Sequence, residues 1–166
     1  MECSSLTSVL IPEKVNSIVR GSFSGCSAII SVDKDNRQYS DIDGVLFDKK
    51  QTELLQYPIS GTGSYSIPKS VISIGNSAFE KCVGLTAIVI PRSVTSIGGS
   101  CFNDCTGLTS ITVNSSTPVE LSSFASAFYN VDKKTCTLYV PIGSKSLYQV
   151  ANQWKNFENI VEIKQN

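Results

Sequence analysis

The chain has 166 residues, of which 41% are hydrophobic and 17% charged, and its 14 basic and 14 acidic side chains leave no formal net charge. Soluble domains usually carry about 25% charged residues, so hydroxyl and amide side chains supply much of the polar surface here. The balanced charge excludes nucleic acid as a predicted partner, because nucleic-acid binders present a basic patch. No apolar stretch approaches the roughly 20 residues that cross a bilayer, and the first residues do not form a signal peptide.

The chain begins inside a repeat unit. Apolar residues follow Cys3 at offsets typical of leucine-rich repeats, and these residues are Leu6, Val9 and Ile11. Because successive side chains of a strand point to opposite faces, Ser8 and Leu10 should face solvent. A second copy then runs from Ile11-Pro12 to Cys26.

Residues 33–66 form an enlarged repeat. The apolar stretches 43–47 and 53–58 flank the polar link 48–52, which predicts a β-hairpin. Gly61-Thr62-Gly63 is predicted to be the loop that returns to the regular repeat.

Two regular copies follow with an offset of 23 residues, and both read I-P-x-S-V-x-S-I-G before an aromatic and a cysteine. They occupy residues 67–88 and 90–111. Ile88 and Ile90 are predicted to point inward. The outward positions on these strands are Ala87, Val89, Ser110 and Thr112.

Residues 114–166 depart from the repeat and are predicted to be a C-terminal capping region. Ser144 is a suitable N-cap for a short helix. The residues at helical spacing that should share one face are Leu147, Val150, Ala151 and Trp154. Phe157 and residues 160–163 are predicted to form a last strand, which would close the open face of the stack.

One repeat cannot fold alone, because its few buried side chains do not offset the entropy of ordering about 23 residues. Stacked repeats share interfaces, so stability is cooperative along the stack. We predict a single domain over residues 1–166. Its fold should be a β-rich solenoid, a right-handed leucine-rich repeat stack of the α/β repeat class, with a hairpin insertion and a C-terminal cap. We expect about four copies and one enlarged member, with tight turns at the A-F-x-x-C segments.

These motifs resemble the BspA-like leucine-rich repeat family of bacterial surface proteins. The resemblance covers nearly the whole chain and includes D-G-V-L-F at 43–47 and L-Y-V-P at 138–141 with Trp154. It implies a secreted or cell-surface protein involved in adhesion to host matrix proteins or in contacts between bacteria. It supplies no catalytic residue. Because the chain opens in mid-repeat, we predict a fragment of a longer exported protein, anchored through segments not present here and without its signal peptide.

Six cysteines raise the question of disulfides or metal. Cys3, Cys26, Cys82 and Cys105 share one repeat position, where buried free thiols acting as small apolar residues are expected. Disulfides between stacked repeats are the alternative. Cys101 and Cys105 have a sequence spacing that occurs between zinc ligands. A structural zinc site needs two further Cys or His ligands, however, and the chain has no His.

Neither a bound metal ion nor a catalytic activity is predicted. The acidic residues around the hairpin are Asp33, Asp35, Asp41, Asp43 and Asp48. They do not match an EF-hand, and turn chemistry explains Asp at such positions better than calcium does. Without His, the Ser-His-Asp and Cys-His constellations are excluded. A carboxylate pair for glycoside hydrolysis stays open, but nothing in the sequence places two carboxylates in a shared pocket, so no catalytic residue and no cofactor are predicted.

The predicted function is protein binding through the outward strand face, for which host extracellular-matrix proteins are candidate partners. The residues assigned to this face are Ser8, Leu10, Ala87, Val89, Ser110 and Thr112. Two alternatives stay open: a structural spacer in a larger surface protein, and a carbohydrate-binding module. A carbohydrate-binding module would need exposed aromatic side chains, for which Tyr39, Tyr57 and Tyr65 are the candidates.

Overall fold

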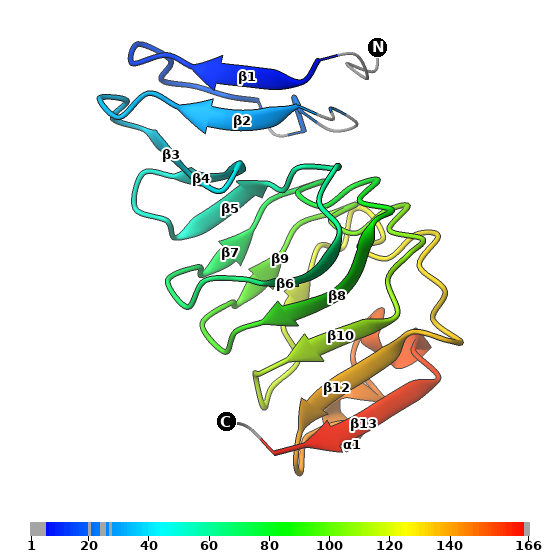
Figure 1. The fold of residues 1–166 in the computed structure, drawn as a ribbon. Helices are drawn as coiled ribbons and strands as arrows, with labels where there is room; N and C mark the ends of the chain where they lie inside the picture. The colour runs from blue at the N-terminus through cyan, green and yellow to red at the C-terminus, as the bar shows by residue number, and fades with distance from the viewer. Residues whose placement is uncertain (1–5, 20, 24–25, 27, 165–166) are drawn as a thin grey trace.

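The computed structural model describes residues 6–19, 21–23, 26 and 28–164. These residues form thirteen short strands, one turn of α-helix and one 3-10 turn. The strands stack in layers along one axis, with β1 (Ser8–Ile11) and β13 (Asn159–Ile163) at its two ends (Figure 1). The predicted β-rich solenoid is confirmed, and it contains little helix. None of the described helices has the length and apolarity that a membrane span requires.

One side of the solenoid is a five-stranded sheet in which all neighbouring strands are parallel. Its strands are β6 (Gly63–Ser66), β8 (Leu85–Ile90), β10 (Ser110–Val113), β12 (Thr137–Pro141) and β13. Ile88 and Ile90 are 1% and 0% exposed, which confirms their predicted inward orientation. The register continues one inward column across the sheet, made of Tyr65, Ile88, Ile111, Leu138 and Ile160.

The opposite side is a six-stranded sheet. Its strands in spatial order are β11 (Glu120–Leu121), β9 (Ser96–Ile97), β7 (Ser73–Ile74), β5 (Glu53–Gln56), β4 (Val45–Asp48) and β3 (Tyr39–Ile42). The antiparallel pair of β4 and β5 confirms the predicted hairpin. A second antiparallel pair, β3 with β4, was not predicted. Asp43 and Gly44 connect these strands with φ of 50° and 82°, and positive φ at both positions is typical of a type I′ turn.

The strand β4 separates two hydrophobic cores. Its Leu46 packs with Ile11 and Ile30 in a small cluster, whereas Val45 and Phe47 belong to the main core. The small cluster lies under a separate two-stranded sheet of β1 and β2 (Ile29–Val32). Leu6, which precedes β1, is 45% exposed.

Aromatic rings stack along the axis of the main core. The ring of Phe102 lies 5.1 Å from that of Phe79 and 5.5 Å from that of Phe128. Behind the rings, turns from successive layers are joined by backbone hydrogen bonds, such as Phe79 N to Cys101 O at 2.9 Å. The predicted turns at the A-F-x-x-C segments are thereby confirmed.

The cap differs from its prediction in one respect. Residues Leu147 and Val150 are 47% and 76% exposed, so the predicted apolar face is wrong, and the buried residue of α1 (Lys145–Tyr148) is Tyr148. The helix has only four residues, so its periodicity does not continue to Trp154, which lies in η1 (Trp154–Asn156). The last strand, β13, is confirmed over residues 160–163. The boundaries 33–66 and 114–166 stay predictions.

Candidate interaction surface

The outer face of the five-stranded sheet carries two rows of side chains. Ala87 lies beside Ser110 in the register of β8 and β10, and Val89 lies beside Thr112. These four predicted residues are therefore brought together. The first row continues to Ser64, Thr137 and Asn159, and the second to Ser66, Tyr139 and Val161. We call these ten residues the outer rows.

The other two predicted residues lie elsewhere. Ser8 and Leu10 belong to β1, whose only sheet partner among the described strands is β2. The β3–β4–β5 meander interrupts the stack after β2, so the repeat pattern alone placed them on a face that is not continuous. Leu10 is 61% exposed and Ile29, on the neighbouring strand, is 55% exposed. These two exposed apolar side chains lie apart from the outer rows.

The outer rows carry no charged side chain. Most of their members are small hydroxyl or aliphatic residues, and Tyr139 and Val161 add apolar area near the cap. Sequence reasoning missed these two, although Tyr139 alternates with the inward Leu138 and Val140 and could have been assigned outward. A face of this kind can bury area without desolvating charges, which is typical of the centre of a protein interface.

The described cysteines are buried free thiols. Cys26, Cys82, Cys101, Cys105 and Cys136 form no disulfide, as predicted, and Cys3 lies outside the described residues. Burial raises the pKa of Cys105 to about 12 and that of Cys136 to about 11. The Cys105 thiol donates a hydrogen bond to Phe79 O at 2.9 Å. The thiolate is the reactive and metal-binding form, so at neutral pH these side chains act as core residues.

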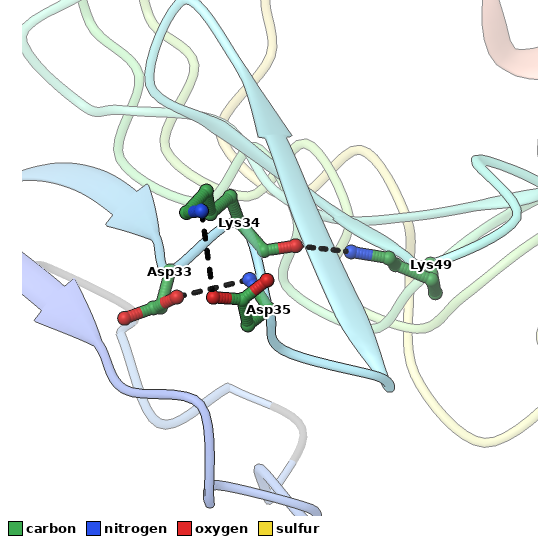
Figure 2. Close-up of polar contacts among 4 residues, drawn as sticks. All are labelled: Asp33, Lys34, Asp35 and Lys49. Atoms are coloured by element: carbon green, nitrogen blue, oxygen red, sulfur yellow. Dashed lines mark hydrogen bonds and ion pairs between the residues drawn. The ribbon is translucent and has the colours of Figure 1, made fainter.

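The acidic residues around the hairpin are engaged in turns. Asp33 accepts a hydrogen bond from Asp35 N at 2.9 Å, and the Lys34 ammonium lies 3.7 Å from the Asp35 carboxylate (Figure 2). The nearby Lys49 ammonium donates to the Lys34 carbonyl at 3.3 Å. Asp48 accepts from the backbone of Thr52 at 2.6 Å. The predicted turn role is confirmed for Asp33 and Asp48, and no cluster of metal-ligand residues occurs in the described part of the chain.

The three tyrosines proposed for sugar stacking are not free. Tyr57 is 6% exposed, and its ring stacks on Phe79 at 5.1 Å. Tyr65 packs against Tyr57 at 4.7 Å, and the Tyr39 hydroxyl accepts a hydrogen bond from Ile18 N at 2.8 Å. Burial therefore removes Tyr57 as a candidate for sugar stacking, whereas Tyr39 and Tyr65 are only partly buried. The most exposed aromatic side chain is instead Phe124, at 99%.

The model of the BspA type leucine-rich repeat region matches residues 1–62 and 57–153, with six copies. The chain belongs to the BspA-type leucine-rich repeat family. Six copies exceed the four or so expected from the sequence, because short or degenerate copies escape a search for a fixed offset. The β2 layer shows why, since Val9 pairs with Ile30, 21 rather than 23 residues later.

Solved structures of bacterial leucine-rich repeat proteins have the same fold. A leucine-rich cell surface protein from Faecalibacterium prausnitzii A2-165 has 23% identity and a TM-score of 0.66, over 99% of this chain and 50% of its own. A leucine-rich repeat protein from Eubacterium ventriosum has 21% identity and a TM-score of 0.61, over 95% and 49%. The pneumococcal vaccine antigen PcpA has 18% identity and a TM-score of 0.59, over 96% and 56%.

At these identities the likeness establishes the fold alone. The chain spans about half the length of the solved structures that it matches. Among curated protein sequences, none matches it significantly.

Proposed function

We propose that this chain is a non-catalytic, protein-binding module of a secreted or cell-surface bacterial protein, and that the outer rows are its contact surface. The observation that carries the proposal is the uncharged, two-row face that the register assembles from the five neighbouring strands of one sheet. Family membership and the likeness to the leucine-rich cell surface protein of F. prausnitzii support the location. Adhesion to host matrix proteins is the role that best fits both an uncharged contact face and a cell-surface location.

The size of the face indicates the affinity to expect. Five strands spaced about 4.8 Å apart extend the rows over about 19 Å, which gives a contact on the order of 300 Å². A standard interface buries about 800 Å² on each partner. The rows therefore form the centre of a contact, and binding by this chain alone should be weak, with a Kd on the order of micromolar.

Binding to purified host matrix proteins, such as fibronectin, laminin and collagen, and to intact bacteria tests the proposal. The test variant is Ser110→Arg with Thr112→Arg, which places two charges in the middle of the outer rows. The control is Ser73→Arg with Ser96→Arg, which places two charges at paired positions on the opposite sheet.

We expect the test variant to lose at least tenfold in affinity and the control to bind like the parent chain. Equal binding by both variants would contradict the role of the outer rows. If neither the matrix proteins nor the cells are bound, the chain is a structural spacer.

A further inference from the structure

A groove of about 910 Å³ crosses the ends of four strands of the five-stranded sheet. The residues that line it follow β6, β8 and β10 directly or end β12, as with Arg92 two positions after β8 and Pro141 at the end of β12. Because the sheet is parallel, the carboxyl ends of its strands lie on the same side (Figure 1). The groove is separate from the outer rows, whose residues do not line it.

Two cations face this groove without an internal partner. Lys69 and Arg92 occupy the same repeat position in adjacent layers, so their backbones are about 5 Å apart. Both are exposed, and within the described ranges neither forms an ion pair or a hydrogen bond through its side chain. No carboxylate is among the lining residues. The two like charges therefore repel one another unless an anion lies between them.

A polar atom in the groove also lacks a partner. The hydroxyl oxygen of Ser93 is buried and has no hydrogen bond in the described part of the chain. An unsatisfied buried hydroxyl costs about 1–3 kcal/mol, and a rotation of the Ser93 side chain would let a ligand oxygen in the groove satisfy it. The equivalent residues of the neighbouring layers, Ser70 and Ser116, are exposed and hence hydrated. The unpaired atom thus occurs at the layer that also holds Arg92.

The far wall of the groove is held in place by the cap. Ser115 O and Thr117 O accept hydrogen bonds from the buried Tyr148 hydroxyl at 2.9 and 3.2 Å. Asn114 N donates to Ile90 O at 2.9 Å, which ties this wall to the layer of Arg92. A ligand would therefore meet a preformed surface and would not have to order a loop.

We propose that this groove binds a sulfated polysaccharide, with Lys69 and Arg92 holding sulfate groups and Ser93 and Asn114 bonding sugar oxygens. Arginine and lysine are the natural partners of sulfate oxygens. A nucleic acid would need more cations and a stacking aromatic, and the lining contains no aromatic. A peptide strand would need a free sheet edge, whereas this groove lies over strand ends.

Heparin oligosaccharide, titrated calorimetrically into the intact chain at low salt, is the probe. Lys69→Gln with Arg92→Gln should weaken binding at least tenfold and reduce the slope of log affinity against log salt by about two. Lys14→Gln with Lys50→Gln removes the same charge at exposed positions outside the groove and should leave affinity within twofold. Ser93→Ala should weaken binding several-fold without lowering the unfolding midpoint, because the hydroxyl has no internal hydrogen bond to lose.

Three outcomes would overturn the proposal: no heparin binding, an equal loss in the Lys14/Lys50 control, or equal binding of desulfated heparin, which keeps its carboxylates. Tighter binding of a phosphopeptide or of an RNA oligonucleotide than of heparin would assign the groove to another class of ligand. The Ser110→Arg/Thr112→Arg variant should retain heparin binding. Its result thus separates failure of this proposal from failure of the outer-row proposal.

Discussion

Phe102 lies in the middle of the aromatic stack and is fully buried between Phe79 and Phe128. Phe102→Ala removes both ring contacts and leaves a cavity, so we expect the free energy of unfolding to fall by about 3–5 kcal/mol. Denaturant unfolding followed by the fluorescence of Trp154, the single tryptophan, measures this. Phe124→Ala, at a side chain that is 99% exposed, should change stability by less than about 0.5 kcal/mol. Similar losses in both variants would contradict the buried stack.

The buried thiols should be inert until the chain unfolds. We expect a thiol reagent at pH 8 to modify none of the five described cysteines in the folded chain, because each is buried. In denaturant without reductant, all six cysteines of the sequence should react. A count below six would reveal an oxidised cysteine, and rapid reaction of Cys82 or Cys105 in the folded chain would contradict their burial.

Cys105 also links stability to pH, since burial raises the pKa of its thiol from 9.0 to about 12. Above pH 9 the unfolded chain loses this proton while the folded chain keeps it. The contribution to stability is therefore fully present below pH 9 and is lost as the pH rises toward 12. We expect unfolding midpoints to fall from pH 8 to pH 10.5, and the fall to be smaller in Cys105→Ala. An identical pH dependence in that variant would argue against the raised pKa.

At the scale of elements, the turn between β3 and β4 depends on Gly44. Its φ is 82°, and a Cβ there would lie 3.0 Å from Ile29 Cγ2. Gly63 is the matched control, because its φ is 76° and a Cβ would have no neighbour within 4 Å. Gly63→Ala should cost about 1–2 kcal/mol of backbone strain.

Gly44→Ala should cost more than Gly63→Ala, because it adds a steric contact to the same strain. Denaturant midpoints of the two variants measure the difference. A larger loss in Gly63→Ala would mean that Ile29 does not pack on the turn.

At the scale of the whole molecule, the two cores should open independently. The small cluster around Ile11, Ile30 and Leu46 has far fewer members than the main core, so it should be less stable. Ile30→Ala should speed amide exchange in β1 and β2 and leave β10 protected. Ile111→Ala, equally buried but in the main core, should speed exchange in β8, β10 and β12. Hydrogen exchange with mass spectrometry resolves these segments, and a uniform response to both variants would indicate a single cooperative unit.

Several features were predictable because local pattern determines them. Alternation assigned Ile88 and Ile90 to the core and Ala87 and Val89 to the outside, since a strand turns successive side chains to opposite faces. The hairpin of β4 and β5 was predicted from two apolar runs around a polar link. The Asp43-Gly44 pair carried an equally good turn signal, but its position at the start of an apolar run hid the strand before it.

The sequence by itself determined that this chain is a stack, because apolar residues repeated every 23 positions can be buried only against their own copies. It also determined which side chains of the regular copies point outward. Only the tertiary structure decided that Ser8 and Leu10 lie apart from the other four, that Tyr57 is buried, and that Lys69, Arg92 and Ser93 share a groove. These outcomes depend on which distant strands pair and in what register, and a pattern confined to neighbouring residues does not encode that choice.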